Sequence, residues 1–240
     1  MVFAGDHYQL PPIINGEYPE PDPGEPVLHR SVFEALIDIQ GGALRRQLLE
    51  NFRMNATLTS YSAELLYGPR YVPGSAAVRD QVLPFTAPDN LSALSAAALD
   101  PAYPLVLVVL NGVTAARENP VEAGLVAEMF CGLREGLRDD AGAVYEEDAE
   151  FFKHGVFVVC PHHAQIQQIQ LALAARRSWS MKPFVDTVDK MQGQEAQAVV
   201  VGYGVSDPEF AQQEARFIYS RNRLNVSITR GRAKTVVCLP

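Results

Sequence analysis

Two arginines in this sequence could bind phosphate groups. Arg53 follows an aromatic residue in the segment ENFRMN, and Arg230 lies in NVSITRGRA near the carboxyl end of the chain. A guanidinium stays charged at physiological pH, and its planar fork can bind two phosphate oxygens at once. Taken alone, each arginine is more simply interpreted as a surface or sheet-capping residue, so the surrounding motifs have to decide between the two interpretations.

Further polar groups occur in segments that follow short apolar runs. GDHYQLPP (5–12), CPHHAQ (160–165) and DTVDKMQGQE (186–195) contribute Asp6, Gln9, Pro161, His162, His163, Gln165, Thr187, Gln192, Gly193 and Glu195. Open α/β sheets bind ligands beyond the carboxyl ends of their strands, so we expect these segments to lie where a ligand binds. Hydroxyl and amide side chains suit nucleic-acid phosphates, and Gly193, without a Cβ, would let the backbone approach a ligand closely.

A metal site is an alternative interpretation of CPHH, because cysteine and histidine are good ligands for zinc. Adjacent histidines point in different directions, however, and no second Cys/His cluster completes four ligands. The three cysteines, Cys131, Cys160 and Cys238, are far apart and form no CxxC pair, which indicates reduced thiols in a cytosolic setting. We therefore expect that this chain holds no metal through its own residues.

The elements that must position these side chains alternate between strand and helix. Strand-like apolar runs occupy 105–110, 155–161, 184–188, 198–205 and 235–239, and helix-like segments occupy 31–39, 56–68, 121–137, 164–177 and 223–233. The fully apolar run at 105–110 is typical of a parallel strand that is covered on both faces. This order predicts an α/β fold with a doubly wound, mostly parallel sheet flanked by helices, in a single domain.

Local signals fix several boundaries. Ser31 and Glu34 form the S-x-x-E capping-box pattern, and Asn119-Pro120 marks the start of a further helix. The Pro-rich segment 15–26 is predicted to be a loop, and 70–103, rich in Ala, Pro and Ser, a loop or loosely packed insert. The acidic stretch 139–150 is predicted to be a solvated loop.

Composition limits the possible partners. The chain has 240 residues, 48% of them apolar, and a formal net charge of -8, which gives no global sign of nucleic-acid binding but allows a local basic groove. No apolar stretch approaches the roughly 20 residues that cross a bilayer, and no signal peptide opens the sequence. We expect an intracellular protein, cytoplasmic or nuclear, without a membrane partner.

Five segments, in this order, closely resemble the later motifs of superfamily 1 helicases, in the branch of the nonsense-decay and replication-associated enzymes. They are GDHYQLPP, LLENFRMN, VFVVCPHHAQ, DTVDKMQGQEAQAVVVGY and LNVSITRGRAKTVV. The resemblance leaves 70–103 and 135–152 unassigned. It implies that residues 15–240 are the second, carboxy-terminal RecA-like motor domain, with an insert near 70–103. Residues 1–14 would be a terminal strand (MVFA) and motif loop belonging to a first RecA-like domain that is absent here.

The resemblance also implies roles for the polar residues. Arg53 and Arg230 would reach the γ-phosphate of ATP, Gln9 with Asp6 would link the phosphate state to domain closure, and Glu195, beside Gln192 and Gly193, would accept a hydrogen bond from the ribose. Pro161, His163, Gln165 and Thr187 would contact single-stranded nucleic acid. The family's usual aromatic residue in that loop is replaced by His163, which weakens the case for base stacking there.

The phosphate-binding loop of such enzymes is missing from the sequence. No Gly-Lys-Ser or Gly-Lys-Thr occurs, and no Asp-Glu pair follows an apolar strand early in the chain. The resemblance therefore implies that ATP and Mg²⁺ bind only together with the first RecA-like domain, and that this chain alone is inactive as an ATPase. The alternative is a stand-alone degenerate module that binds nucleic acid or a partner protein without hydrolysing ATP.

Overall fold

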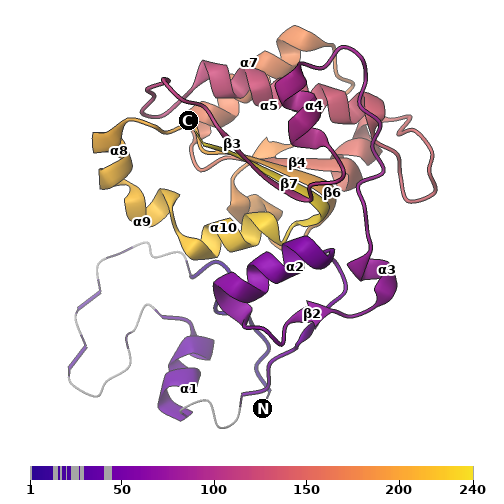
Figure 1. Ribbon diagram of the computed structural model, residues 1–240. Helices are drawn as coiled ribbons and strands as arrows, with labels where there is room; N and C mark the ends of the chain where they lie inside the picture. Colours follow the sequence, from indigo (N-terminus) through magenta and orange to yellow (C-terminus); the bar gives the residue numbers. More distant parts are fainter. Residues whose placement is uncertain are drawn as a thin grey trace.

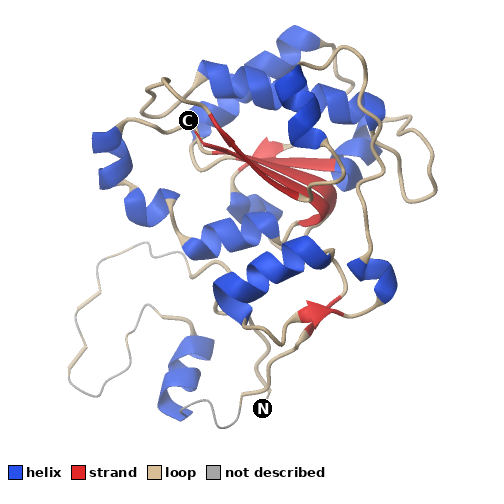
Figure 2. Cartoon of the chain, in the orientation of Figure 1, coloured by secondary structure: helices blue, strands red, loops and turns tan. Residues whose placement is uncertain are grey.

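The computed structural model describes residues 2–12, 16, 18–19, 21–22, 27, 30–40 and 45–239. Within them the central sheet, red in Figure 2, lies among the helices. It has five parallel strands in the order β3-β7-β6-β4-β5. These strands are β3 (Leu105–Val109), β4 (Val156–Val159), β5 (Val185–Asp186), β6 (Ala196–Gly202) and β7 (Gly231–Leu239). The predicted RecA-like α/β fold is confirmed.

Helices cover both faces of this sheet (Figure 1). One face packs against α4 (Ala93–Leu99), α5 (Pro120–Gly136) and α7 (His163–Arg176). The other face packs against the 3₁₀ turn η3 (Val188–Met191) and α10 (Arg221–Ile228), and α2 (Ala56–Ser62) lies beyond α10. Val200 of β6 faces the first group, whereas Val199 and Val201 face the second. Burial of each such side chain contributes about 1.5–3 kcal/mol, which explains why β6 is apolar along its length.

Two helix starts follow the sequence prediction closely. In α1 (Val32–Gln40) the Glu34 backbone N–H donates to Ser31 Oγ at 3.1 Å, and the Ser31 N–H donates to Glu34 Oε2 at 3.3 Å. Asn119 Oδ1 accepts hydrogen bonds from the backbone N–H groups of the first turn of α5. These caps satisfy backbone donors that the helix itself leaves free.

The remaining described elements are short. They are β1 (Glu50–Asn51), η1 (Ala63–Tyr67), β2 (Val72–Pro73), α3 (Ala76–Arg79), α6 (Asp148–Glu150), η2 (Phe151–Gly155), α8 (Pro208–Gln213) and α9 (Ala215–Ile218). Strands β1 and β2 pair in parallel as a separate small ribbon. In the part of the chain that the structure describes, no helix is long and apolar enough to cross a membrane.

Two predicted loops are more ordered than expected. Segment 70–103 is loop over most of its length but contains two short helices, and Leu83 and Leu99 lie in the main core, so it is not loosely packed throughout. The acidic stretch is also not fully solvated, because Asp148 is buried and its Oδ1 accepts from Arg134 Nε at 2.9 Å. In both cases a minority of the residues in the segment are buried, which average composition conceals.

Two strand predictions also need correction. β3 is an edge strand, and Leu107 and Val109 are 59% and 52% exposed, because α2 and α10 cover only the start of β3, at Leu105. Val2–Ala4 form no strand in the structure, since no other described strand lies beside them to pair with their backbone groups. The predicted boundary between residues 14 and 15, and most of the predicted loop 15–26, lie outside the described residues.

Candidate nucleotide and nucleic-acid site

Arg53 and Glu195, far apart in the sequence, form an ion pair at one edge of the sheet. Arg53 Nε donates to Glu195 Oε2 at 2.6 Å, and Arg53 Nη1 donates to the carbonyl oxygen of Thr229 at 3.0 Å. Both side chains retain exposure, 29% for Arg53 and 46% for Glu195. A partly exposed pair of this kind is weak on its own, so an anionic ligand can compete for the guanidinium.

Arg230 lies next to this pair but is only 3% exposed. It follows α10, which ends at Ile228, so the prediction that it lies on that helix is wrong. Its guanidinium donates to the carbonyl oxygens of Val226 (3.2 Å) and Gln194 (3.3 Å) and to Thr229 Oγ1 (3.3 Å). Burial, followed by the nearby charge of Arg53, lowers the pKa of Arg230 to about 10, which still leaves it a cation at neutral pH.

These residues lie at the amino ends of the strands, not at the carboxyl ends as the sequence pattern suggested. Glu195 directly precedes β6, and Arg230 directly precedes β7. The segment DTVDKMQGQE runs from the carboxyl end of β5 to the amino end of β6, and its buried Val188 and Met191 pack under the sheet. One segment therefore contacts both edges, which a strand-by-strand prediction could not show.

The GDHYQLPP loop packs against α10 and η1. Asp6 Oδ2 accepts from Gln9 Nε2 at 2.9 Å and from the Tyr67 hydroxyl at 2.6 Å. Asn225 Nδ2 donates to the Tyr8 carbonyl at 3.0 Å, and Asn222 Nδ2 donates to the Gln9 carbonyl at 2.7 Å. Burial and the Asp6 carboxylate raise the pKa of Tyr67, which keeps its hydroxyl a donor to Asp6.

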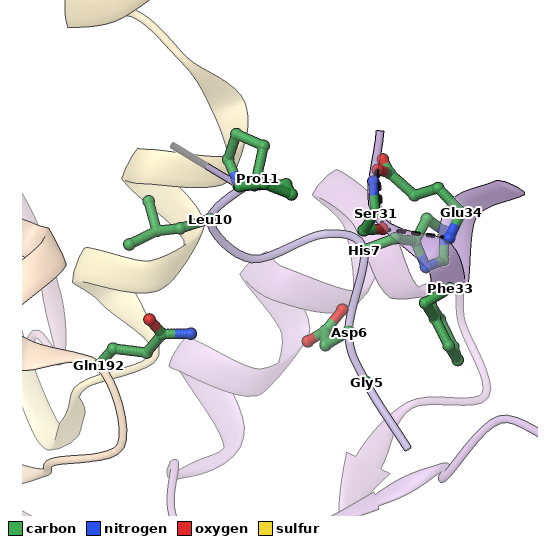
Figure 3. Close-up of a pocket in the computed structure, with 10 residues that line it drawn as sticks. Gly5, Asp6, His7, Leu10, Pro11, Ser31, Phe33, Glu34 and Gln192 are labelled. Carbon is green, nitrogen blue, oxygen red and sulfur yellow. Dashed lines mark hydrogen bonds between the residues drawn. The ribbon is translucent and has the colours of Figure 1, made fainter. Parts of the chain in front are cut away.

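A cavity of about 410 Å³ lies between this loop, the start of α1 and Gln192 (Figure 3). Asp6 and Gln192 line it, together with Phe33 and Glu34 of α1. Gln192 and Gly193 are exposed, and Gly193 has a φ of 83° with no atom near the position of a Cβ. The predicted nucleotide-side residues Asp6, Gln9, Arg53, Gln192, Gly193, Glu195 and Arg230 thus share one side of the molecule.

Three of the four residues predicted to contact single-stranded nucleic acid lie at the opposite edge of the sheet, where the β-strands end. Pro161 follows the end of β4, His163 is the exposed first residue of α7, and Thr187 follows β5. Gln165 contradicts the prediction, because its side chain is fully buried. It hydrogen-bonds to Asn119 and Glu122 of α5 and cannot touch a strand in this arrangement.

The described residues do not suggest a metal site. Among them, no group of three or more His, Cys, Asp or Glu side chains is arranged to hold a metal ion. Cys160, the cysteine of CPHH, is buried next to Glu122, and burial raises the pKa of its thiol well above the usual value. A protonated, enclosed thiol is a poor metal ligand.

Comparison with known proteins shows the family of this chain. The model of a family described as an AAA domain matches residues 28–239, which is most of the chain. The chain belongs to this family. With its RecA-like sheet and its helicase relatives, it is a superfamily 1 helicase-type AAA domain.

Three relatives illustrate the similarity. The chain is 27% identical over 245 residues to the DNA replication ATP-dependent helicase/nuclease JHS1 of Arabidopsis thaliana, covering 99% of the chain and 17% of the relative. It is 28% identical over 259 residues to DNA2 of Bos taurus, another DNA replication ATP-dependent helicase/nuclease (100% and 22%). It is 26% identical over 238 residues to the DNA-binding protein SMUBP-2 of Rattus norvegicus (98% and 22%). The chain thus spans about a fifth of the length of these relatives.

An aromatic cluster at the carboxyl edge of this AAA domain was missed by the sequence analysis. The His162 ring lies 5.7 Å from that of Phe210 and 5.9 Å from that of Phe217, and Tyr219 stacks on Tyr203 at 6.0 Å. Arginines join it: Arg223 lies 4.2 Å over Phe217, and Arg117 lies 5.5 Å over Phe210. The available signal was the three aromatic residues in 210–219, between the fourth and the fifth motif.

Proposed function

We propose that this chain is the carboxy-terminal RecA-like motor domain of an ATP-dependent helicase. The convergence of Arg53, Arg230 and Glu195 at the amino edge of the sheet carries this proposal. Phosphoryl transfer depends on positioned positive charge, and an arginine supplied across an interface raises the rate by about 10³–10⁵. A module that only binds nucleic acid has no use for two cations beside a carboxylate at this edge.

ATP and Mg²⁺ fit this edge only in part. Arg53 and Arg230 suit phosphate oxygens, and the exposed Glu195 suits a ribose hydroxyl. The Asp6 carboxylate, however, is occupied by Tyr8, Gln9 and Tyr67, and the sequence has no Gly-Lys-Ser/Thr loop to surround the phosphates. A first RecA-like domain would therefore supply the phosphate loop and the metal ligands, as in P-loop enzymes generally.

The Arg53–Glu195 ion pair joins two of the residues that would hold the nucleotide. Arg53 would bind a phosphate in place of Glu195, and the Glu195 carboxylate would then be free to accept from a ribose hydroxyl. Arg230 must exchange at least one of its 3.3 Å hydrogen bonds to reach the same phosphate. Arg53 is accordingly the more accessible of the two arginines.

The carboxyl edge would bind the strand. Pro161, His163 and Thr187 lie there beside the aromatic cluster, and bases stack on aromatic rings while hydroxyls contact phosphates. We propose single-stranded DNA as the strand, because the relatives are named as DNA replication helicases and a DNA-binding protein. Such a role places the protein inside the cell.

Two segments would couple the edges. DTVDKMQGQE joins Thr187 at the carboxyl edge, where DNA would bind, to Gln192, Gly193 and Glu195 at the amino edge, where the nucleotide would bind. The GDHYQLPP loop lies along α10, and its Asp6 and Gln9 are held beside Tyr67. Loss of the γ-phosphate would move these segments and thereby change the affinity for single-stranded DNA.

The test joins the chain to a P-loop-bearing first RecA-like domain from a helicase relative. Arg53→Ala and Arg230→Ala should each lower kcat for ATP by at least about 10²-fold, because the charge that develops on the phosphoryl group loses its partner. The affinity for single-stranded DNA without nucleotide should stay the same. Arg79→Ala, which removes an exposed arginine paired with its neighbour Asp80, is the matched control.

The binding-module alternative predicts a different pattern. In that case the two arginine variants would leave kcat at the value of the Arg79→Ala control, and only DNA affinity would respond to substitutions. Such a result would reject the motor proposal and favour the alternative.

A further inference from the structure

A buried cluster at the carboxyl edge joins three elements through polar side chains. Gln165, in the first turn of α7, is fully buried, as are Asn119 and Glu122 at the start of α5. The Gln165 Oε1 accepts from the Asn119 backbone N–H at 2.7 Å, and its Nε2 donates to Glu122 Oε1 at 3.0 Å. Glu122 Oε2 accepts from the Gly204 backbone N–H, after β6, at 3.1 Å.

The geometry leaves no freedom for the Gln165 amide to turn over. Its oxygen faces the N–H of Asn119, while its nitrogen faces the Asn119 carbonyl at 3.3 Å and the Glu122 carboxylate. A reversed amide would oppose donor to donor and acceptor to acceptor. Gly204, with a φ of 70°, lies so close that a Cβ there would be 2.8 Å from the Gln165 side chain.

We propose that Gln165 is a positioning residue, which with Glu122 sets the spacing between the loop after β4 and the loop after β6. The first loop carries Pro161 and His163, and the second begins at Tyr203 of the aromatic cluster. The consequence for DNA rests on the proposed function: Gln165 affects strand binding through these loops and does not touch the strand.

We call the hydrogen-bonded cluster of Asn119, Glu122, Gln165 and Gly204 the clamp. The carboxylate of Glu122 makes the clamp sensitive to protonation. As an anion it accepts from two donors, Gln165 and Gly204, whereas a protonated carboxyl must present its hydrogen to one of them. Burial raises the pKa of Glu122 to about 7, against the opposing effect of these two hydrogen bonds. The clamp should therefore be intact above about pH 7 and weakened below it.

The other titratable groups that face Glu122 do not share this range. Cys160 at the end of β4 and Cys238 on β7 both lie near the carboxylate, and burial raises the pKa of each thiol. They remain neutral thiols around pH 7. Among the described groups, His162 at the same edge has its pKa lowered by burial and does not hydrogen-bond to the cluster.

The first measurement follows the Gly204 amide by NMR in the full chain between pH 5.5 and 8.5. In the wild type its resonance should shift with a midpoint near pH 7, and in Glu122→Gln the shift should disappear. Gln165→Met should raise the midpoint, because it removes a hydrogen bond that favours the carboxylate. Gln168→Met, on the same helix but bonded to the exposed Glu118, should leave the midpoint unchanged.

The second measurement is the affinity of the same proteins for a fluorescent oligothymidine at fixed salt and pH 8. Gln165→Met and Glu122→Gln should each weaken binding about tenfold, and Gln168→Met should not. A Gly204 amide that does not titrate, or an unchanged midpoint in Gln165→Met, would overturn the clamp. Weaker binding in Gln165→Met with an unaltered Gly204 titration would also overturn it, since Gln165 would then touch the strand itself. If even the wild type binds no strand while Gly204 titrates as described, the clamp stands and the DNA-binding proposal fails.

Discussion

At the scale of single residues, the carboxyl edge has its stacking surfaces at positions other than the expected one. His163 is the residue expected to stack, but the ring of its neighbour His162 lies 5.9 Å from that of Phe217, and Phe217 and Tyr219 are 36% and 51% exposed. The guanidinium of Arg223 lies over Phe217, and stacked arginines favour contacts with bases and phosphates. These two rings are the candidates to replace the missing stack.

Tyr219→Ala and Phe217→Ala should each weaken binding of single-stranded DNA by about 1–3 kcal/mol, the usual contribution of one base–aromatic stack. Binding titrations at fixed salt without nucleotide would measure the change. Tyr103→Ala is the control, because Tyr103 is 62% exposed, more than either tested ring, but lies beside Lys234, away from the carboxyl ends of the strands. Equal affinities for all three variants would exclude stacking on this cluster.

At the scale of elements, a buried ion pair fixes the acidic segment after α5. Arg134 donates to Asp148 Oδ1 at 2.9 Å and to the carbonyl oxygens of Tyr145 and Glu146, while Asp148 Oδ2 accepts from the Ser180 N–H at 2.9 Å. These hydrogen bonds outweigh burial and lower the pKa of Asp148. The segment is thereby attached both to α5 and to the chain after α7.

Asp148→Ala should destabilise the fold by about 3–5 kcal/mol, because it leaves the Arg134 charge buried without its partner. Chemical denaturation at pH 7 would measure the difference, with the exposed Glu146→Ala as control. Since the folded pKa is depressed, the contribution of Asp148 is present above its unfolded pKa and is lost as pH falls through the folded value. The two variants should therefore converge in stability at low pH; a constant gap would argue against the ion pair as the cause.

The elements also show what the sequence could predict. Apolar runs and caps located four of the five sheet strands and the starts of α1 and α5 to within a few residues, because burial and capping leave local signals. The edge position of β3, the buried Asp148 and the burial of Gln165 depend on which elements meet in space, and no local pattern records that. The motifs supplied the candidate site residues, but their order along the chain did not reveal that these residues divide between two opposite edges of one sheet.

At the scale of the whole molecule, the sheet separates the proposed nucleotide side from the proposed DNA-binding side. Arg53, Glu195 and Arg230 lie before the strands begin, and Pro161, His163 and Thr187 lie after they end. The parallel sheet lies between them, and the segments that run along it would couple the two edges. This division is why substitutions at the amino edge should lower ATP turnover but leave the DNA affinity measured without nucleotide unchanged.

The same division predicts that the isolated chain has no significant ATPase activity, with or without single-stranded DNA. Its amino edge offers two guanidiniums and a carboxylate, but the sequence contains no Gly-Lys-Ser/Thr loop whose N–H groups and lysine would hold the β- and γ-phosphates. Without that hold, nothing aligns the attacking water with the phosphoryl group. Steady-state phosphate release at saturating oligonucleotide should stay at background, whereas the joined two-domain enzyme should turn over at about 1–10³ per second. DNA-stimulated turnover in that range, co-eluting with the isolated chain and lost in its Arg53→Ala variant, would show that the chain forms a complete nucleotide site by itself.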